Sequence, residues 1–248
     1  RHIGAAGPDS RWAIDRLAGF GVDTGFVRVT NTPTGHAIVM IDPQGENQIV
    51  IYPGANRAQD LNVITNAIAS AHPGEWLMLQ NETSHQVDAA KQASALGLNV
   101  AYSAAPFEVQ AVRGILPYLS LLIMNAVEAE QLSNALALPV SGLPVSNVLV
   151  TKGSKGADWI DTKRGETVSI KAFQVDPVDT TGAGDTFSGY TIAGLAQGLS
   201  PSEALRRASA AAAIKVTRKG TADAIPTLQE VLDFLDQLPA NGAADPQS

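Results

Sequence analysis

The sequence predicts an α/β protein, with a mostly parallel sheet covered by helices on both faces and a small antiparallel β lid. From residue 61 onward, short apolar runs alternate with helical stretches, which is typical of such a sheet. Two β-rich runs precede this region, separated by a turn that contains Pro and Gly. At 248 residues, the chain is long enough for one large domain. We therefore predict a single domain over residues 1–248, with a hairpin lid portion at residues 33–56.

The N-terminal part of the chain predicts one short helix and one hairpin. Apolar residues at helical spacing, followed by Gly19 and Gly21, predict the helix over residues 11–17. The two β-rich runs lie at residues 36–42 and 48–52, and the Pro and Gly between them are typical of a hairpin turn. These runs predict an antiparallel pair of strands.

The rest of the chain predicts the alternation that defines the fold class. Apolar runs bounded by Gly, Pro or Asn predict strands at 76–80, 99–103, 121–125 and 148–151. Helical patterns fall at 61–71, 86–96, 127–137, 186–197, 201–216 and 228–238. In open parallel sheets, ligands bind beyond the carboxyl ends of the strands. We therefore expect the chemistry in loops that follow strands.

Composition excludes several classes of function. The net charge of −7 and pI near 5.0 argue against a nucleic-acid surface, which needs clustered Lys and Arg. No apolar run approaches the roughly 20 residues that span a bilayer, so we expect no membrane partner. The absence of cysteine excludes disulfides and thiolate sites, and agrees with a cytoplasmic location.

The most informative motif is DTTGAGD at residues 179–185, directly before a helix. Outward N–H groups and the macrodipole make a helix start an anion site, and Gly182 and Gly184 let a phosphate approach the backbone. An acid beside such a site is explained if Asp185 accepts a hydroxyl proton as the oxygen attacks a γ-phosphoryl group. The alternative is a plain turn before a helix acid, which a lone Gly-x-Gly would favour.

As a whole, residues 179–187 resemble the C-terminal signature of the ribokinase-like (PfkB) family of carbohydrate kinases. The similarity covers essentially residues 4–238, and further segments match in family order: 33–35, 45–47, 53–56, 125–128, 151–156 and 216–220. The resemblance implies a ribokinase-like fold and an ATP-dependent kinase acting on a sugar hydroxyl. Ribose is the best single expectation. It also implies Mg²⁺, potassium activation, and a homodimer formed through the lid.

The resemblance also implies roles for individual residues. Asp185 would be the base, with backbone N–H groups of Gly182, Ala183 and Gly184 stabilising the phosphoryl group. The other matches are Asn125 and Glu128 (Mg²⁺ indirectly, and phosphate), Thr151, Gly153, Gly156 and Ser209 (nucleotide), Glu82 (sugar), and Asp179 and Thr181 with carbonyls at Lys215, Arg218 and Gly220 (potassium).

Plainer explanations stay open for several of these residues. Asn125 and Glu128 have the spacing of a helix cap, and the glycines at 153 and 156 suit a hairpin turn. Glu82 could be an ordinary loop acid, and Ser209 could serve helix packing.

The identity of the acceptor stays open as well. The family's acidic residue on the first strand and its glycine-rich N-terminal element do not occur here, so we expect the usual N-terminal segment to be missing. Kinases for 2-keto-3-deoxygluconate, fructose or nucleosides share much of the remaining pattern. A noncatalytic nucleotide-binding or sensing fragment is the alternative from another class.

Overall fold

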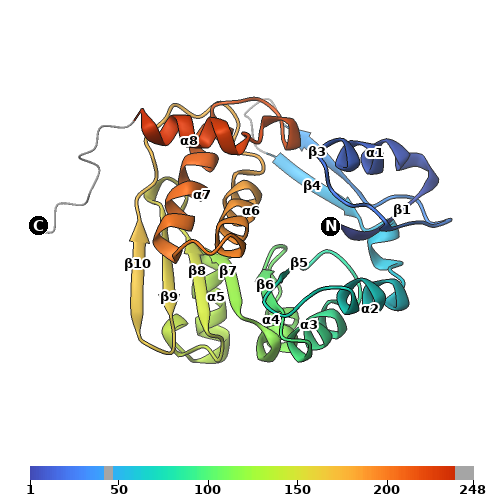
Figure 1. Cartoon of the computed structure of the whole chain (residues 1–248), viewed down its shortest axis with the longest axis horizontal. Coiled ribbons are helices and arrows are strands. Elements are labelled where there is room, and N and C mark those ends of the chain that lie inside the picture. The colour runs from blue at the N-terminus through green and yellow to red at the C-terminus, as the bar shows by residue number, and fades with distance from the viewer. Residues whose placement is uncertain (42–46, 238–248) are drawn as a thin grey trace, which may run out of the picture. The chain divides into compact units, whose positions relative to one another are not determined.

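The computed structural model describes residues 1–41 and 47–237, which group into two compact units (Figure 1). The first unit comprises residues 1–100 with 104–119, and the second comprises 101–103 with the chain from residue 120 onward. Throughout the described residues, every helix is too short or too polar to cross a membrane.

The second unit is built on a sheet in the order β10-β9-β8-β7-β6. Strands β6 (Asn99–Ser103), β7 (Leu121–Asn125) and β8 (Asn147–Thr151) run parallel, and β9 (Ala157–Asp161) and β10 (Glu166–Ile170) continue the sheet antiparallel. The central residues of β7 and β8 are buried, as their continuous apolar sequences require. Parallel pairing brings the carboxyl ends of β7 and β8 together, because Asn125 pairs with Thr151.

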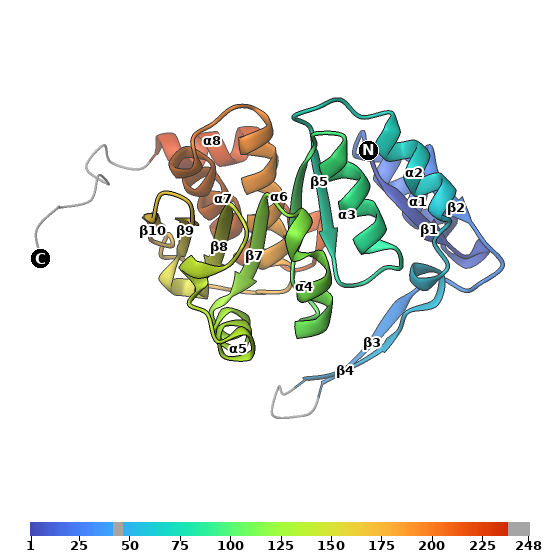
Figure 2. The same ribbon diagram turned by 90° about the horizontal axis from the view of Figure 1, so that it is seen from below.

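Helices cover both faces of this sheet (Figure 2). On one face, α5 (Ala126–Leu136) contacts β7 and β8. On the other, α6 (Ala183–Ala196) packs closely on α7 (Pro201–Val216), which also contacts β10 and α8 (Leu228–Asp236). Small side chains allow the close packing, since a Cβ on Gly194 would lie only 3.0 Å from the Cβ of Ala204.

The first unit contains two small sheets and one further strand. Strands β1 (Ile3–Ala6) and β2 (Phe26–Val29) pair in parallel, and β3 (His36–Ile41) and β4 (Asn47–Tyr52) form an antiparallel hairpin. The apolar strand β5 (Trp76–Gln80) is only partly buried along its whole length.

Its helices are α1 (Arg11–Gly19), α2 (Leu61–Ala69), α3 (Gln86–Ala95) and α4 (Val109–Ile115). Helix α2 contacts β1, β2 and α3, and α3 contacts α4 and β5. The side chain of Asp60 caps α2 by accepting from the backbone N–H of Asn62 at 2.9 Å.

The predicted α/β class and antiparallel hairpin are confirmed. Several details were wrong: α6 begins at Ala183 rather than 186, and the elements β1, β2, α4, β9 and β10 were not predicted. The helix starts earlier because Gly182 adopts a left-handed conformation (φ 76°) that redirects the chain there. Residues 42–46, at the predicted strand end and hairpin turn, and position 238 lie outside the described residues. One domain over residues 1–248 stays a prediction.

Candidate active site

A cavity of about 430 Å³ lies within the second unit, beyond the carboxyl ends of β7 and β8. It brings together all five residues predicted to bind a nucleotide, although they come from four different elements and loops. They are Asn125, Thr151, Gly153, Gly156 and Ser209. Ala183 and Gly184 of the glycine-rich turn line the same cavity. Residues that lie between positions 125 and 209 of the sequence thus line one cavity.

The predictions missed the apolar side of this cavity. Phe173, Val175 and Pro177 line it from the segment between β10 and the glycine-rich turn, and Phe187 and Val216 line it from α6 and α7. The alternating apolar residues at 173, 175 and 177, just before residue 179, were the signal that could have identified this wall.

The start of α6 differs from the starts of α5, α7 and α8. Each of those three helices begins with a capping box, in which a side chain accepts from the third backbone N–H of the helix. At α6 the N-cap is Gly182, and no described side chain caps the helix. A Cβ added at Gly182 or Gly184 would meet no described atom within 4 Å. The N–H of Ala183 already donates to the carbonyl oxygen of Thr180 at 3.1 Å, whereas the backbone at the two glycines is open to a ligand, and helix starts favour anions.

Asp185 lies in the first turn of α6 and is exposed. It directly follows Gly184, which lines the cavity. The structure therefore places this carboxylate next to the open helix start, as the motif predicted.

Asn125 and Glu128 form the helix cap that their spacing allowed. The side-chain oxygen of Asn125 accepts from the N–H of Glu128 at 2.9 Å, and Oε2 of Glu128 accepts from the N–H of Asn125 at 2.8 Å. Asn125 also lines the cavity, so capping and ligand contact are compatible.

A magnesium ion would find suitable chemistry near this cap. The described residues contain no cluster of three or more acidic or histidine side chains that could hold a metal by themselves. Mg²⁺ commonly binds one or two carboxylates together with waters and substrate phosphates. The carboxylate of Glu128 at the sheet edge fits that mode.

The loop after β8 is a hairpin turn that leads antiparallel into β9. Gly156 has φ 99°, and a Cβ there would come within 1.9 Å of the carbonyl oxygen of Ile170. Only glycine fits this approach. Lys152 forms an ion pair with Asp158, so its charge is directed to the hairpin itself.

Ser209 lines the cavity from α7 and is 5% exposed. Its hydroxyl donates to the carbonyl oxygen of Lys171 at 3.4 Å, which links α7 to the end of β10. Ala212, one turn further on, also lines the cavity. The face of α7 that packs against the end of β10 therefore also lines the cavity.

Asp179 holds the beginning of the glycine-rich turn. Its two carboxylate oxygens accept from the backbone N–H groups of Thr181 at 2.9 Å and Gly220 at 3.0 Å. Hydrogen bonds from Thr181, then that from Gly220, and the charge of Lys215 lower the pKa of Asp179 to about 2. The ammonium group of Lys215 donates a hydrogen bond to the main-chain oxygen of Asp179 at 2.9 Å.

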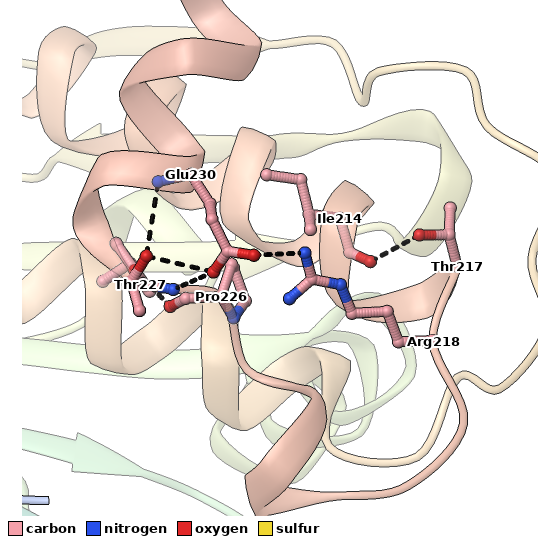
Figure 3. A network of polar contacts seen from close by, with 7 residues as sticks. Ile214, Thr217, Arg218, Pro226, Thr227 and Glu230 are labelled. Atoms are coloured by element: carbon pink, nitrogen blue, oxygen red, sulfur yellow. Dashed lines mark hydrogen bonds and ion pairs between the residues drawn. The ribbon is translucent and has the colours of Figure 1, made fainter.

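The Arg218 side chain points to a different partner (Figure 3). It donates to Oε1 of Glu230 at 2.6 Å, while Oε2 of Glu230 accepts from the N–H of Thr227 at 2.7 Å. These bonds, with that from Arg218 the largest cause, lower the pKa of Glu230 to about 2. The loop that follows α7 is thereby fixed to the start of α8.

Glu82 lies elsewhere, in the first unit. It is exposed just after β5 and lines a separate cavity of about 450 Å³, together with β5 and residues 1–3. His36, at the start of β3, packs against Tyr52 of β4, with the ring centroids 5.2 Å apart and the ring planes tilted by 43°.

Comparison with known proteins gives a consistent family assignment. The model of the pfkB family carbohydrate kinases matches residues 2–228. The chain is 33% identical over 229 residues to ribokinase from Haemophilus influenzae, covering 87% of this chain and 74% of that protein. It is 35% identical over 261 residues to ribokinase from Arabidopsis thaliana, covering 94% of this chain and 66% of that protein.

Solved structures agree with the sequence relatives. The ribokinase from Thermotoga maritima has a TM-score of 0.82 at 33% identity, covering 94% of this chain and 80% of that one. The Arabidopsis thaliana ribokinase complexed with ribose and ATP has a TM-score of 0.79 at 30% identity, with the same two coverages. With a family model over most of the chain and relatives at this identity, the chain belongs to the pfkB family of carbohydrate kinases.

Proposed function

We propose that this carbohydrate kinase transfers the γ-phosphoryl group of ATP to a hydroxyl of ribose, with Asp185 as the general base. The observation that supports this most is the single cavity lined by Asn125, Thr151, Gly153, Gly156 and Ser209, which ends at the open start of α6. Relatives named ribokinase support the choice of sugar.

The lining of the cavity suits the two ends of ATP. Adenine would lie against Phe173 and Val175 on one side and Ala212 on the other, because these apolar side chains favour a flat, apolar ring. The phosphates would extend to Gly182–Gly184, where glycine permits contact with backbone N–H groups. When bound, Mg²⁺ would supply charge neutralisation, and Glu128 would hold it indirectly.

The proposed chemistry is a single in-line transfer. The acceptor oxygen forms a bond to the γ-phosphorus while its proton passes to the Asp185 carboxylate. The bond from that phosphorus to the β–γ bridging oxygen breaks, and ADP leaves. A carboxylate suffices as base, since this transfer depends mostly on positioning and on charge stabilisation.

The acceptor end of the proposal rests on Glu82 and on the β3–β4 hairpin. Glu82 lines the cavity of the first unit, where it could accept from sugar hydroxyls. The hairpin would serve as a lid that excludes water and prevents hydrolysis of ATP. Fructose, 2-keto-3-deoxygluconate and nucleosides are the alternative acceptors.

We also propose that two chains associate through this hairpin. The proposed location of the protein is the cytoplasm, where ATP is available. Ile38, Met40, Val50 and Tyr52 share one face of the hairpin and are 44–56% exposed. An exposed apolar face of this kind favours burial against another surface. For the position at Asp179, the resemblance implies a monovalent cation, whose positive charge would stabilise the glycine-rich turn.

The decisive experiment is a panel of acceptors, with ADP formation as the readout. D-Ribose, D-fructose, 2-keto-3-deoxygluconate and inosine are compared by kcat/KM, with Asp185→Asn as the inactive control. We expect the highest value for ribose. If ADP binds but no acceptor stimulates its formation from ATP, the noncatalytic nucleotide-binding alternative is correct.

A further inference from the structure

A buried lysine lies beneath the glycine-rich turn and is not used by the proposed chemistry. Lys215, in the last turn of α7, is 0% exposed, yet it carries an ammonium group. Burying a charge is strongly unfavourable unless oppositely charged or dipolar groups compensate for it. The surroundings of this ammonium therefore indicate what it does.

Those surroundings are rich in oxygen. The ammonium donates to the main-chain oxygen of Asp179 at 2.9 Å, and it is close enough to the Asp179 carboxylate to help lower the pKa of that group. It also lies at the C-terminal end of α7, the negative end of the helix dipole. No ion pair within the described ranges 1–41 and 47–237 includes Lys215. Carbonyl dipoles and a nearby carboxylate are what a monovalent cation requires.

The oxygens of Asp179 already have donors. Thr181 and Gly220 each direct a backbone N–H to one carboxylate oxygen, and the Lys215 ammonium occupies the main-chain oxygen. The Arg218 side chain turns away to Glu230. A potassium ion would need these same oxygens as ligands. Each oxygen could accept a second contact, but the buried ammonium would repel another cation bound to the same oxygens, so this site does not fit potassium while the ammonium is in place.

We infer that the Lys215 ammonium is the resident cation of the glycine-rich turn and replaces the potassium ion that the family resemblance implied. Lys215 is a positioning residue. The carbonyl of Val216, beside it, accepts from the N–H groups of Val178 at 2.7 Å and Asp179 at 3.0 Å. These hydrogen bonds join the end of α7 to the segment that leads to Gly182. The Lys215 ammonium supplies the positive charge at this junction. The inference rests on the proposed role of that turn in phosphoryl transfer.

The test compares cations at equal ionic strength. Wild-type protein should have the same turnover and the same unfolding temperature in KCl and in NaCl. Lys215→Ala removes the ammonium and leaves space for an ion. We expect its turnover to fall about 100-fold in NaCl, because the turn is misplaced, and to recover largely in KCl or NH₄Cl. Lys163→Ala, the same substitution at an exposed position, is the matched control and should behave as wild type.

Two further measurements make the outcome unambiguous. Lys215→Gln keeps a hydrogen-bond donor without the charge, so full turnover of this variant in NaCl would overturn the inference. Activation of the wild type by KCl over NaCl would overturn it too, as would a folded Lys215→Ala whose loss no cation restores. The unfolding temperature of Lys215→Ala should rise in KCl relative to NaCl. That readout needs no sugar or ATP, so it holds even if the proposed acceptor is wrong.

Discussion

The two cavities of this protein are built in different ways. In the second unit, the cavity lies beyond strands whose central residues are buried, and its polar lining comes from the last residues of β7 and β8, from the loops that follow β8 and β10, and from Ser209 of α7. In the first unit, the cavity is lined mainly by β5, whose residues are only partly buried, and by the segment after it.

This difference has a functional consequence. A ligand that is the same throughout a family, such as a nucleotide, can be held by backbone groups and glycine turns. A ligand that varies, such as a sugar, must be recognised by side chains on strands and loops. Short sequence motifs reveal a site of the first kind, but they do not reveal a site of the second kind. The following predictions test this contrast, from the largest expected effect to the smallest.

Asp185→Asn should have the largest effect. The variant keeps the shape of the turn but cannot accept a proton, so we expect kcat to fall about 10²- to 10⁴-fold. ADP affinity and unfolding temperature should stay unchanged. Asp176→Asn, the same substitution at an exposed acid outside the cavity lining, is the control. Near-normal kcat in Asp185→Asn would remove the general base from the proposal.

Gly156→Ala should be the most destabilising change in the nucleotide cavity. Its Cβ would overlap the carbonyl oxygen of Ile170 and would also require an unfavourable positive φ. We expect a loss of roughly 3 kcal/mol or more in the free energy of unfolding. Gly153→Ala also has positive φ but no such overlap, and should lose only about 1 kcal/mol. Equal losses in thermal or urea unfolding would contradict the close approach.

Ala212→Phe should affect ATP and not the sugar. The added ring would fill the space that we assign to adenine, so the KM for ATP should rise about tenfold, equivalent to about 1.4 kcal/mol. The KM for ribose should change little. Ala18→Phe, at an exposed position on α1, controls for the added ring. If the KM for ATP does not change, adenine binds somewhere other than beside Ala212.

Glu82→Gln should show the reverse pattern. Loss of the carboxylate weakens hydrogen bonds to sugar hydroxyls, so the KM for ribose should rise about tenfold while that for ATP stays constant. Steady-state kinetics with each substrate varied in turn provides the measurement. A change in both constants would show that Glu82 acts on the fold of the first unit as a whole.

The smallest effect concerns pH. The pKa of Asp179 is lowered from 3.8 to about 2, so folding favours its ionised form. The stabilisation is fully present above the unfolded pKa and is lost as pH falls through the folded pKa. The difference in unfolding temperature between wild type and Asp179→Asn should therefore be constant above about pH 5 and shrink between about pH 4 and pH 2.

Much of the fold could be predicted because its signals are local. The strands at 121–125 and 147–151 are continuous apolar runs, and Asn125 with Glu128 marks the start of α5 by spacing alone. The strands β9 and β10 were missed because each is only five residues long and mixes polar with apolar residues: Ala157 and Trp159 are the buried residues of β9, and no residue of β10 is buried. Their existence depends on pairing with β8, which is a property of the assembled sheet.

The candidate site divides in the same way. The glycine-rich turn, the cap at Asn125 and the loop at Gly156 are sequence motifs, and the structure brings them together. The apolar wall at Phe173 had a local signal in the alternating apolar residues 173, 175 and 177, whereas the side-chain contact of Lys215 with Asp179 depends on tertiary packing across 36 positions. The sequence assigned Lys215 only a main-chain role, because nothing local reveals where a long side chain will point.

The glycine start of α6 also places stability and activity in competition at one residue. A search for heat-resistant variants would favour Asn at position 182, because it tolerates a left-handed backbone and caps a helix. Such a side chain would occupy the place that we assign to the transferred phosphate. The protein should therefore gain heat resistance there only by losing turnover, and an engineer seeking a durable enzyme should leave Gly182 unchanged.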